Sequence, residues 1–406
     1  MIDGRLNQEF KQREAGTFRQ LRAAGSDTLL LYANGHSLGT ATRSHGYARY
    51  LTGWNSANQP AAIIMQQSRR PVVYVPNIFM KFLADEYYDN LDVRFVPPTC
   101  FGTTVGQHIN DLVGKGGKVG YIGRNESTFA FERQLTGECT SVEFFDFERS
   151  VDALRTIKSE YEICQHRAAA ELCDRLFALA FAEARSGKAA FQIQADLQRE
   201  ALYSGADFCT TWITAGPVAD YSRFLPVECR RIPQDNDQYV VGIMLLYQGH
   251  WGHAIRMGNL GAPNRAQSDA FDTVTAMHDA MFAHIRAGAP IRDLQEVAED
   301  VLTTRAPAGH KIFKFRFAHP LGHSYADPLP DGIQPFPQQY EQGPVYTGDF
   351  RLKPGMLLEI HPNFFAHDYA GAAIGDMVLV TDDGLEPLTA YPSVTGRRYG
   401  ANAGSA

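Results

Sequence analysis

Short apolar runs bounded by turn-forming residues recur along residues 1–153. Thr28–Tyr32 and Val72–Val75 show the pattern, in which a few leucine, valine and tyrosine residues lie between polar turns. Such runs indicate buried strands, and the amphipathic stretches between them indicate helices. We predict strands at 28–32, 61–65, 72–75, 93–96, 119–122 and 142–145, and helices at 7–24, 79–89 and 105–114. This alternation predicts a first domain of the α/β class over residues 1–153.

The hydrophobic period changes after residue 153, and longer helical stretches appear first. Leu172, Leu176 and Leu179 recur at helical spacing within a long helix that we predict from about 160 to 185. Further helices are predicted at 189–204, 266–287 and 291–304, and strands at 208–214, 238–247, 355–361 and 371–381. A Pro-rich insertion covers 328–344. The second domain, residues 160–406, is therefore predicted to mix helices and strands, which makes the whole chain α+β.

Composition narrows the class of protein without naming an activity. The chain has 406 residues, 44% hydrophobic and 20% charged, which is ordinary for a globular protein with room for two domains. A net charge of −7 and the lack of a long basic run argue against binding to nucleic acid. Six cysteines without a CxxC pair suggest buried thiols in a reducing compartment. No apolar run approaches the ~18 residues of a membrane span, so we expect a cytoplasmic protein.

Histidines gather in three segments that follow or contain apolar runs. His319 and His323 lie four residues apart between 317 and 325, His250 and His253 lie between 247 and 256, and His361 follows a strand-like run. Imidazoles that converge from separate strands can form a transition-metal site. The alternative is a set of hydrogen-bonded core histidines that bind no metal. Both interpretations are open from the residues alone.

Four motifs in a fixed order suggest a family. They are the junction over residues 154–162, Ala289-Pro290 before a helix, the run His319-Pro320-Leu321-Gly322-His323, and the segments 352–357 and 378–384 taken together. This order resembles the pita-bread family of methionine and Xaa-Pro aminopeptidases, prolidase, creatinase, ectoine hydrolase and a dimethylsulfoniopropionate lyase. The resemblance implies a C-terminal pita-bread domain preceded by a smaller creatinase-type α/β domain. It also implies a homodimer.

The resemblance also identifies metal-ligand positions, most of which have changed. In that family two aspartates, one histidine and two glutamates bind two divalent metals, and the matching positions here are Gly242, His253, His323, His361 and Gly375. A standard dinuclear centre is therefore not expected. His253, His323 and His361 are instead predicted to hold one divalent transition metal, Fe²⁺ or Zn²⁺ first, with Mn²⁺, Ni²⁺ or Cu also compatible. Such a metal would sharply lower the pKa of a bound water.

Other polar residues are candidates for roles around this metal. His319 matches a histidine of the Xaa-Pro peptidases and is predicted to donate a proton or polarise a carbonyl, although a structural hydrogen bond is an equal alternative. Arg223 is a candidate clamp for a substrate carboxylate, with surface solvation as the alternative. Glu359 shares a strand face with His361, because side chains alternate, and is expected at the pocket rim. The residues predicted to line the pocket are His250, Trp251, Trp212 and Tyr325.

Arg256 and Asp376 also lie near these motifs, but we do not expect either to bind the metal in the predicted strand register. Arg256 is expected to form a structural ion pair. Asp376 would replace the missing last ligand only if its strand slipped by one residue.

The resulting functional prediction is a metalloenzyme that acts on a small amino-acid-like molecule by C–N hydrolysis or lysis. Oxygenase or oxidase chemistry at a three-histidine Fe²⁺ site is one alternative. A metal-free hydrolase like creatinase or ectoine hydrolase is another, and a non-catalytic peptide-binding module is the last. We expect a small-molecule substrate and no nucleic-acid or membrane partner.

Overall fold

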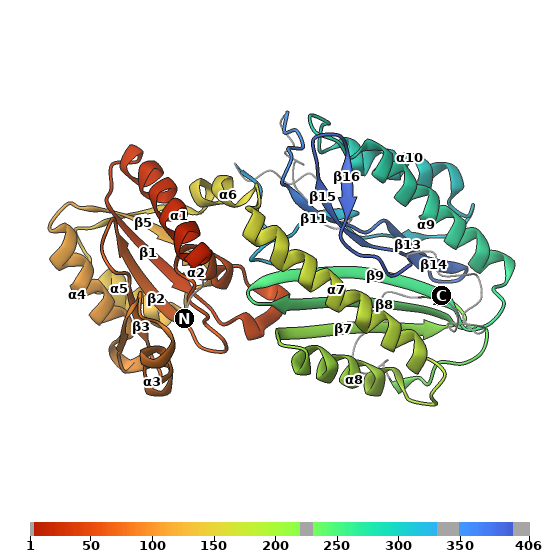
Figure 1. Cartoon of the computed structure of the whole chain (residues 1–406), viewed down its shortest axis with the longest axis horizontal. Coiled ribbons are helices and arrows are strands. Elements are labelled where there is room, and N and C mark those ends of the chain that lie inside the picture. Colours follow the sequence, from red (N-terminus) through yellow and green to blue (C-terminus); the bar gives the residue numbers. More distant parts are fainter. Residues whose placement is uncertain (1–3, 220–229, 331–348, 393–406) are drawn as a thin grey trace. The chain divides into compact units, whose positions relative to one another are not determined.

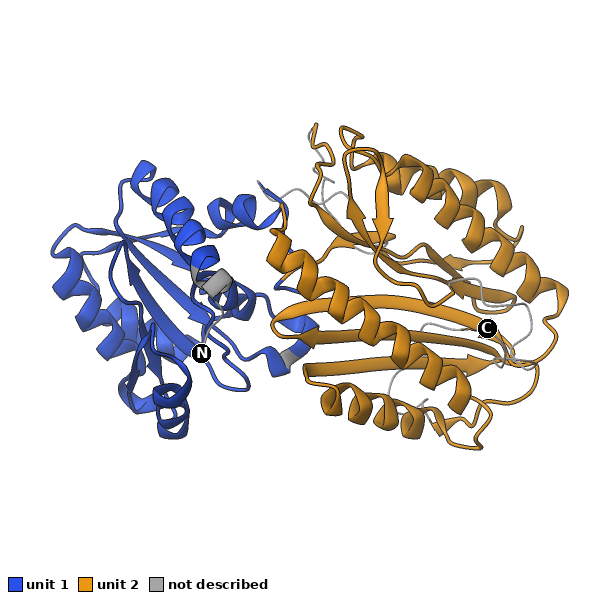
Figure 2. Cartoon of the chain, viewed as in Figure 1, with its two compact units in different colours: residues 1–156, 323–331 blue, residues 157–322, 332–406 orange. Residues whose placement is uncertain are grey.

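The computed structural model describes residues 4–219, 230–330 and 349–392. The chain divides into two compact units (Figure 2): unit 1 comprises residues 1–156 and 323–331, and unit 2 comprises residues 157–322 and 332–406. A short segment that begins at His323 therefore belongs to unit 1, although the residues on both sides of it belong to unit 2. No described helix is long and apolar enough to cross a membrane.

Unit 1 is built on a mixed sheet with the strand order β4-β3-β2-β1-β5-β6 (Figure 1). The central strand β1 (Thr28–Ala33) pairs antiparallel with β2 (Ala61–Gln66) and parallel with β5 (Lys118–Ile122). The outer strands are β3 (Val72–Val75), β4 (Asp92–Phe95) and β6 (Glu143–Asp146). The helices are α1 (Gly4–Ala23), α2 (Ser44–Thr52), α3 (Ile78–Tyr87), α4 (Phe101–Val113), α5 (Phe129–Glu138) and α6 (Glu148–Arg155), with short 3-10 turns at His36–Ala41, Pro98–Cys100 and Arg124–Glu126.

The continuous apolar run of β1 is explained by burial on both faces of the sheet. Leu29 and Leu31 belong to one hydrophobic cluster, and Leu30 and Tyr32 belong to another. Successive side chains of a strand point to opposite faces, so a strand covered on both sides is apolar at every position. The predicted strands of this unit are all present, and the predicted helices are α1, α3 and α4. Helices α2, α5 and α6 were not predicted.

The described part of unit 2 combines four long helices with three sheets. The helices are α7 (Glu160–Glu183), α8 (Ala190–Tyr203), α9 (Arg265–His284) and α10 (Asp293–Arg305). The first sheet is a meander of β7 (Ala206–Gly216), β8 (Gln238–Tyr247) and β9 (His250–Asn259). The second has the order β11-β12-β15-β16, and the third the order β10-β13-β14. Their bounds are β10 (Ile312–Phe313), β11 (Ala318–Pro320), β12 (Leu357–Ile360), β13 (Asn363–Ala366), β14 (Ala370–Ala373), β15 (Asp376–Val380) and β16 (Leu385–Pro387).

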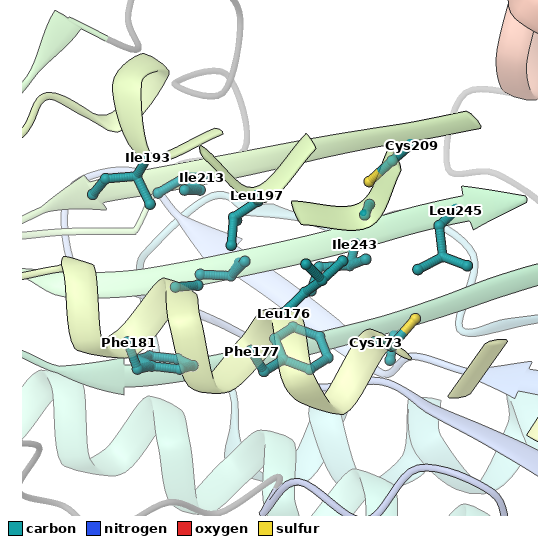
Figure 3. Close-up of a cluster of buried hydrophobic side chains, with 14 of the residues drawn as sticks. Cys173, Leu176, Phe177, Phe181, Ile193, Leu197, Cys209, Ile213, Ile243 and Leu245 are labelled. Carbon is teal, nitrogen blue, oxygen red and sulfur yellow. The ribbon is translucent and has the colours of Figure 1, made fainter. Parts of the chain in front are cut away.

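Helix α7 begins at a capping box and covers the first sheet. The Ser159 hydroxyl accepts a hydrogen bond from the Glu162 N–H at 3.2 Å, and the Glu162 carboxylate accepts one from the Ser159 N–H at 3.0 Å. Leu176 and Phe177 of α7 then pack with residues of α8, β7 and β8 in one buried cluster (Figure 3). This packing gives the meander a rigid backing.

Strand β9, which carries two candidate histidines, was not predicted as a strand. It follows β8 through Gln248 and Gly249, whose φ angles of 47° and 78° are typical of the tight turns that join hairpin strands. The hairpin register places Met244 opposite His253 and Gly242 opposite Ile255. An isolated bridge between Ile255 and Gly375 then links β9 to the segment between β14 and β15. The predicted strand over 371–381 is accordingly two strands separated at Ile374 and Gly375.

The described cysteines are free thiols, as expected, but they are not all buried. Cys139, Cys173 and Cys209 are buried, whereas Cys164 is exposed on α7 and Cys100 is partly exposed. Burial raises the pKa of the Cys209 thiol to about 12, so it stays protonated at neutral pH.

Candidate metal centre

Three imidazoles and one carboxylate meet in the interior of unit 2. His253 comes from β9, His319 from β11, Glu359 from β12, and His361 directly follows β12. Each offers one potential ligand atom, and these four atoms all lie within 4.8 Å of one another. None of the four residues is more than 2% exposed. We call these residues the unit-2 cluster.

Strand pairing brings the cluster together. His319 lies directly opposite Glu359 in the antiparallel pair of β11 and β12, so their side chains share one face of the sheet. Glu359 and His361 share that face because they are two positions apart. The ring centroids of His253 and His319 are 5.8 Å apart and nearly parallel, while the His361 centroid lies 5.3 Å from that of His319.

The backbone fixes which ring nitrogen of His253 and His319 faces the cluster. Nδ1 of His253 is 2.9 Å from the carbonyl oxygen of Ile243, and Nδ1 of His319 is 3.0 Å from that of Pro320. A carbonyl oxygen only accepts hydrogen bonds, so each Nδ1 carries the proton and each Nε2 keeps its lone pair. Both Nε2 atoms lie near the Glu359 carboxylate. This arrangement is the usual way in which proteins orient an imidazole toward a metal.

The imidazoles of His253 and His361 are held in the neutral form that binds metals. Burial lowers the pKa of His253 to about 4. Burial, with the neighbouring rings of His319 and His253, holds the pKa of His361 well below its usual value. At neutral pH both rings are therefore uncharged, and no proton has to leave before a cation binds.

Glu359 is the acidic member of the cluster and has no exposed surface. Its Oε2 accepts a hydrogen bond from Nδ1 of His361, whereas Oε1 accepts none from any described residue. Oε1 is 3.5 Å from Nε2 of His253, and Oε2 is 3.7 Å from Nε2 of His319. Two ligand atoms bound to one tetrahedral Zn²⁺ lie about 3.4 Å apart, given metal–ligand bonds near 2.1 Å. The donor types and their spacing therefore fit a divalent transition metal.

Gly375 lies against the cluster, and Gly242 lies on β8, which pairs with β9; at both positions another side chain takes up the space. A Cβ atom at Gly375 would lie 2.4 Å from Oε1 of Glu359. A Cβ atom at Gly242 would lie 2.2 Å from Cε2 of the Trp212 indole, which stands opposite it on β7. Neither position has room for a side chain while Glu359 and Trp212 keep these conformations.

Asp376, the alternative ligand, is engaged in a separate buried network. Its carboxylate accepts hydrogen bonds from Arg256 Nη2 at 2.6 Å, His278 Nε2 at 2.9 Å and Thr389 Oγ1 at 2.6 Å. Burial alone would raise the pKa of Asp376, but the Arg256 charge and these hydrogen bonds outweigh it and hold the pKa well below its usual range. The expected structural ion pair of Arg256 is confirmed. Asp376 pairs with Ile360 in register, so the one-residue slip does not occur.

The remaining predicted site residues are not members of the unit-2 cluster. His323 and Tyr325 belong to unit 1, where the His323 ring packs edge-on against Tyr50 at 5.8 Å. His250 is buried at the start of β9 and packs against His166 with ring centroids 5.2 Å apart. Arg223 lies outside the described residues.

Trp251 and Trp212 are both buried on the first sheet of unit 2. The Trp251 ring packs against Phe208 with centroids 5.9 Å apart, and Trp212 covers Gly242. Glu359 is the residue that the sequence placed least well, since it lies inside the cluster rather than at a rim. The alternation of side chains along 359–361 was the available signal for that position.

Comparison with known proteins agrees with this architecture. Residues 164–382 match the sequence pattern of metallopeptidase family M24. An uncharacterized peptidase of Staphylococcus aureus strain bovine RF122 is 23% identical over 84% of this chain and 92% of its own length. The prolidase of Pyrococcus horikoshii superposes with a TM-score of 0.74 at 19% identity, over 94% of this chain and 99% of its own. The prolidase of Thermococcus sibiricus superposes with a TM-score of 0.77 at 18% identity, over 96% of this chain and 98% of its own.

Proposed function

Because this chain belongs to metallopeptidase family M24 and has its pita-bread fold, we propose that it is a metal-dependent hydrolase that cleaves a C–N bond of a small amino-acid-like substrate. The observation that carries the proposal is the unit-2 cluster, whose oriented imidazoles suit one divalent transition metal. Fe²⁺ and Zn²⁺ are the first candidates.

His253, His319 and His361 would hold the metal. A bound divalent cation polarises a carbonyl group and makes a bound water acidic near neutral pH. The protein contributes burial and orientation: the backbone carbonyls of Ile243 and Pro320 fix the rings of His253 and His319. A dry interior strengthens the electrostatic interactions of the substrate with these residues.

The choice of His319 differs from the predicted ligand His323. We propose His319 because it belongs to the same unit as His253 and His361 and presents its Nε2 to the same carboxylate. The prediction of His323 as a ligand, and that of Arg223 as a carboxylate clamp, stay predictions. The same holds for the homodimer and for a cytoplasmic location.

The related structures suggest which substrates to test first. Several of these are described as prolidases or Xaa-Pro dipeptidases, so dipeptides with a C-terminal proline are the first compounds to test, followed by N-acyl amino acids and small amides. Purified full-length protein, stripped with a chelator and reloaded with Fe²⁺, Zn²⁺ or Mn²⁺, should release an amine from at least one of them. The absence of amine release with every metal, from protein that retains one bound equivalent, would refute the hydrolase proposal.

His319→Ala and His323→Ala separate the two ligand sets. We expect His319→Ala to lose metal binding and turnover, and His323→Ala to retain metal binding. The reverse result would restore His323 as the third ligand. Three imidazoles at Fe²⁺ also favour a second candidate, oxygen-dependent chemistry. Substrate-dependent O₂ consumption by the Fe²⁺ form, measured with the same compounds, would identify it.

A further inference from the structure

We infer that Glu359 is an anionic ligand of the metal, and that the site is built to hold one cation rather than two. The inference rests on the proposed function only in assigning ligands to the same site. It adds a carboxylate that comes from β12, and it adds a physical reason for a single metal.

The first observation is the space that Glu359 occupies. The Gly375 Cα lies so close to the carboxylate that a Cβ there would come within 2.4 Å of Oε1, and within 3.1 Å of the His361 Cβ. The bridge between Ile255 and Gly375 holds that backbone in place, with the Gly375 N–H donating to the Ile255 carbonyl at 2.8 Å. Glycine at position 375 thus lets the Glu359 carboxylate enter the cluster. Any larger residue would force it to move.

The second observation is the hydrogen bonding of the two carboxylate oxygens. Oε2 accepts the Nδ1 proton of His361, so it has a partner within the protein. Oε1 is fully buried and accepts no hydrogen bond within the described part of the chain, while Nε2 of His253 lies 3.5 Å away with its lone pair on the same side. Carboxylate oxygens and imidazole lone pairs that face each other in a dry interior repel unless a cation or a proton lies between them. Arg316 is a partly exposed basic side chain whose charge lowers the pKa of His253.

The third observation concerns β8, the strand that pairs with β9 and its His253. Trp212 and Gly242 are directly opposed on β7 and β8, and a Cβ at 242 would lie 2.2–2.5 Å from three atoms of the indole. The Trp212 ring therefore fills the volume that a ligand side chain on β8 would need. The unit-2 cluster itself offers one set of convergent donors, three imidazoles and one carboxylate. That set suits a single late first-row cation.

Glu359→Gln is the decisive variant, because it separates a ligand from a positioning residue. The glutamine amide oxygen can still accept the His361 Nδ1 proton, so a residue that merely orients His361 would be replaced without loss. If Glu359 is a metal ligand, however, glutamine cannot replace it, because the negative charge of the carboxylate is lost. Chelator-treated full-length protein would be titrated with Co²⁺ and Zn²⁺, with calorimetry for affinity and stoichiometry and the visible Co²⁺ spectrum for coordination.

We expect one equivalent of metal in the unmodified protein, and an affinity at least 100-fold lower in Glu359→Gln with a changed Co²⁺ spectrum. Gly375→Ala should lower the affinity at least 10-fold, because its Cβ displaces Oε1 without removing any ligand. The matched control is Asp237→Asn, which neutralises a buried acid paired with Arg231 elsewhere in unit 2 and should bind metal normally. Circular dichroism would establish that each variant is folded.

Two outcomes would overturn the inference: a Glu359→Gln affinity within threefold of the unmodified protein with the same spectrum, or a second equivalent that the unmodified protein binds and Glu359→Gln loses together with the first. Either result can occur while the unmodified protein still hydrolyses its substrate, in which case the proposed function survives. Conversely, a folded Glu359→Gln protein that loses metal, together with an unmodified protein that binds metal but hydrolyses nothing, would refute the function and leave Glu359 a ligand.

Discussion

Replacement of Asp376 by asparagine should destabilise unit 2 strongly, because it leaves the buried Arg256 guanidinium without its counter-charge. Arg256 has no exposed surface, and its guanidinium lies 5.2 Å from the centre of the Phe177 ring. Loss of one partner from a buried ion pair costs about 3–5 kcal/mol, since the other charge stays buried and unpaired. Arg256 keeps its hydrogen bonds to the carbonyls of Tyr391 and Ile255, at 2.8 and 2.9 Å, so we expect the lower end, about 3 kcal/mol.

Urea unfolding followed by tryptophan fluorescence would measure this loss. Trp212 and Trp251 lie in unit 2 and Trp54 lies in unit 1, so a Trp54→Phe background reports unit 2 alone. With an m-value near the upper end of the usual range, a loss of about 3 kcal/mol lowers the urea midpoint by about 1 M.

Thr389→Val is the matched control, because it removes one hydrogen bond to Asp376 and keeps the ion pair, at a cost of about 1 kcal/mol. If Asp376→Asn were no more destabilising than Thr389→Val, the reasoning from buried charge would be wrong. Arg256 also donates to the Gly375 carbonyl, next to the candidate metal site. Metal affinity should therefore fall in Asp376→Asn and stay nearly unchanged in Thr389→Val.

Two further predictions concern packing and pH. Gly242→Ala places a methyl group 2.2 Å from the Trp212 ring and should lower the free energy of unfolding, measured in urea, by about 1–3 kcal/mol. The double variant Gly242→Ala, Trp212→Leu should recover part of that loss. An unchanged urea midpoint in the single variant would refute the packing argument. In unit 1, burial and then the neighbouring His36 and Arg155 lower the pKa of His45 to about 3, below the unfolded value near 6.5. The folded state therefore binds fewer protons than the unfolded state, so the free energy of unfolding of unit 1 should be highest above pH 6.5 and fall by up to about 3 kcal/mol between pH 7 and pH 4. His45→Asn should make this pH dependence weaker. An equally steep loss of stability in acid for the variant would assign the effect to other groups.

The sequence predicted the architecture well because its periodic patterns are local. Strands β1, β2 and β3 of unit 1 are apolar at nearly every position, and burial on both faces of the sheet produces that signal directly. Strand β9 escaped prediction because its run from His250 to Asn259 contains histidine, arginine and asparagine, which are uncommon in buried strands. Those polar residues are buried through tertiary contacts such as the Arg256–Asp376 pair, and no local pattern contains these contacts.

The candidate site was predicted in part, for a similar reason. His253 and His361 were identified from aligned positions, and both lie in the unit-2 cluster. The inward position of Glu359 depends on the absence of a side chain at Gly375, which lies sixteen residues later in the sequence, after two intervening strands. Likewise, Trp212 explains Gly242 only when β7 and β8 are seen in register. Such pairs of compensating residues become visible only in three dimensions.

Because of the segment 323–331, the chain passes between the two units more than once. The backbone passes between the units after residues 156, 322 and 331, so no single cut releases either unit intact. Within unit 1, Arg155 and Asp327 form an ion pair in which both side chains are at most 2% exposed, and Asp327 comes from this returning segment. A fragment that ends at residue 156 would keep Arg155 and lose Asp327, so the N-terminal portion should be less stable alone than in the whole chain. Any gene fusion or domain exchange in this protein would have to carry the short late segment along with the early one.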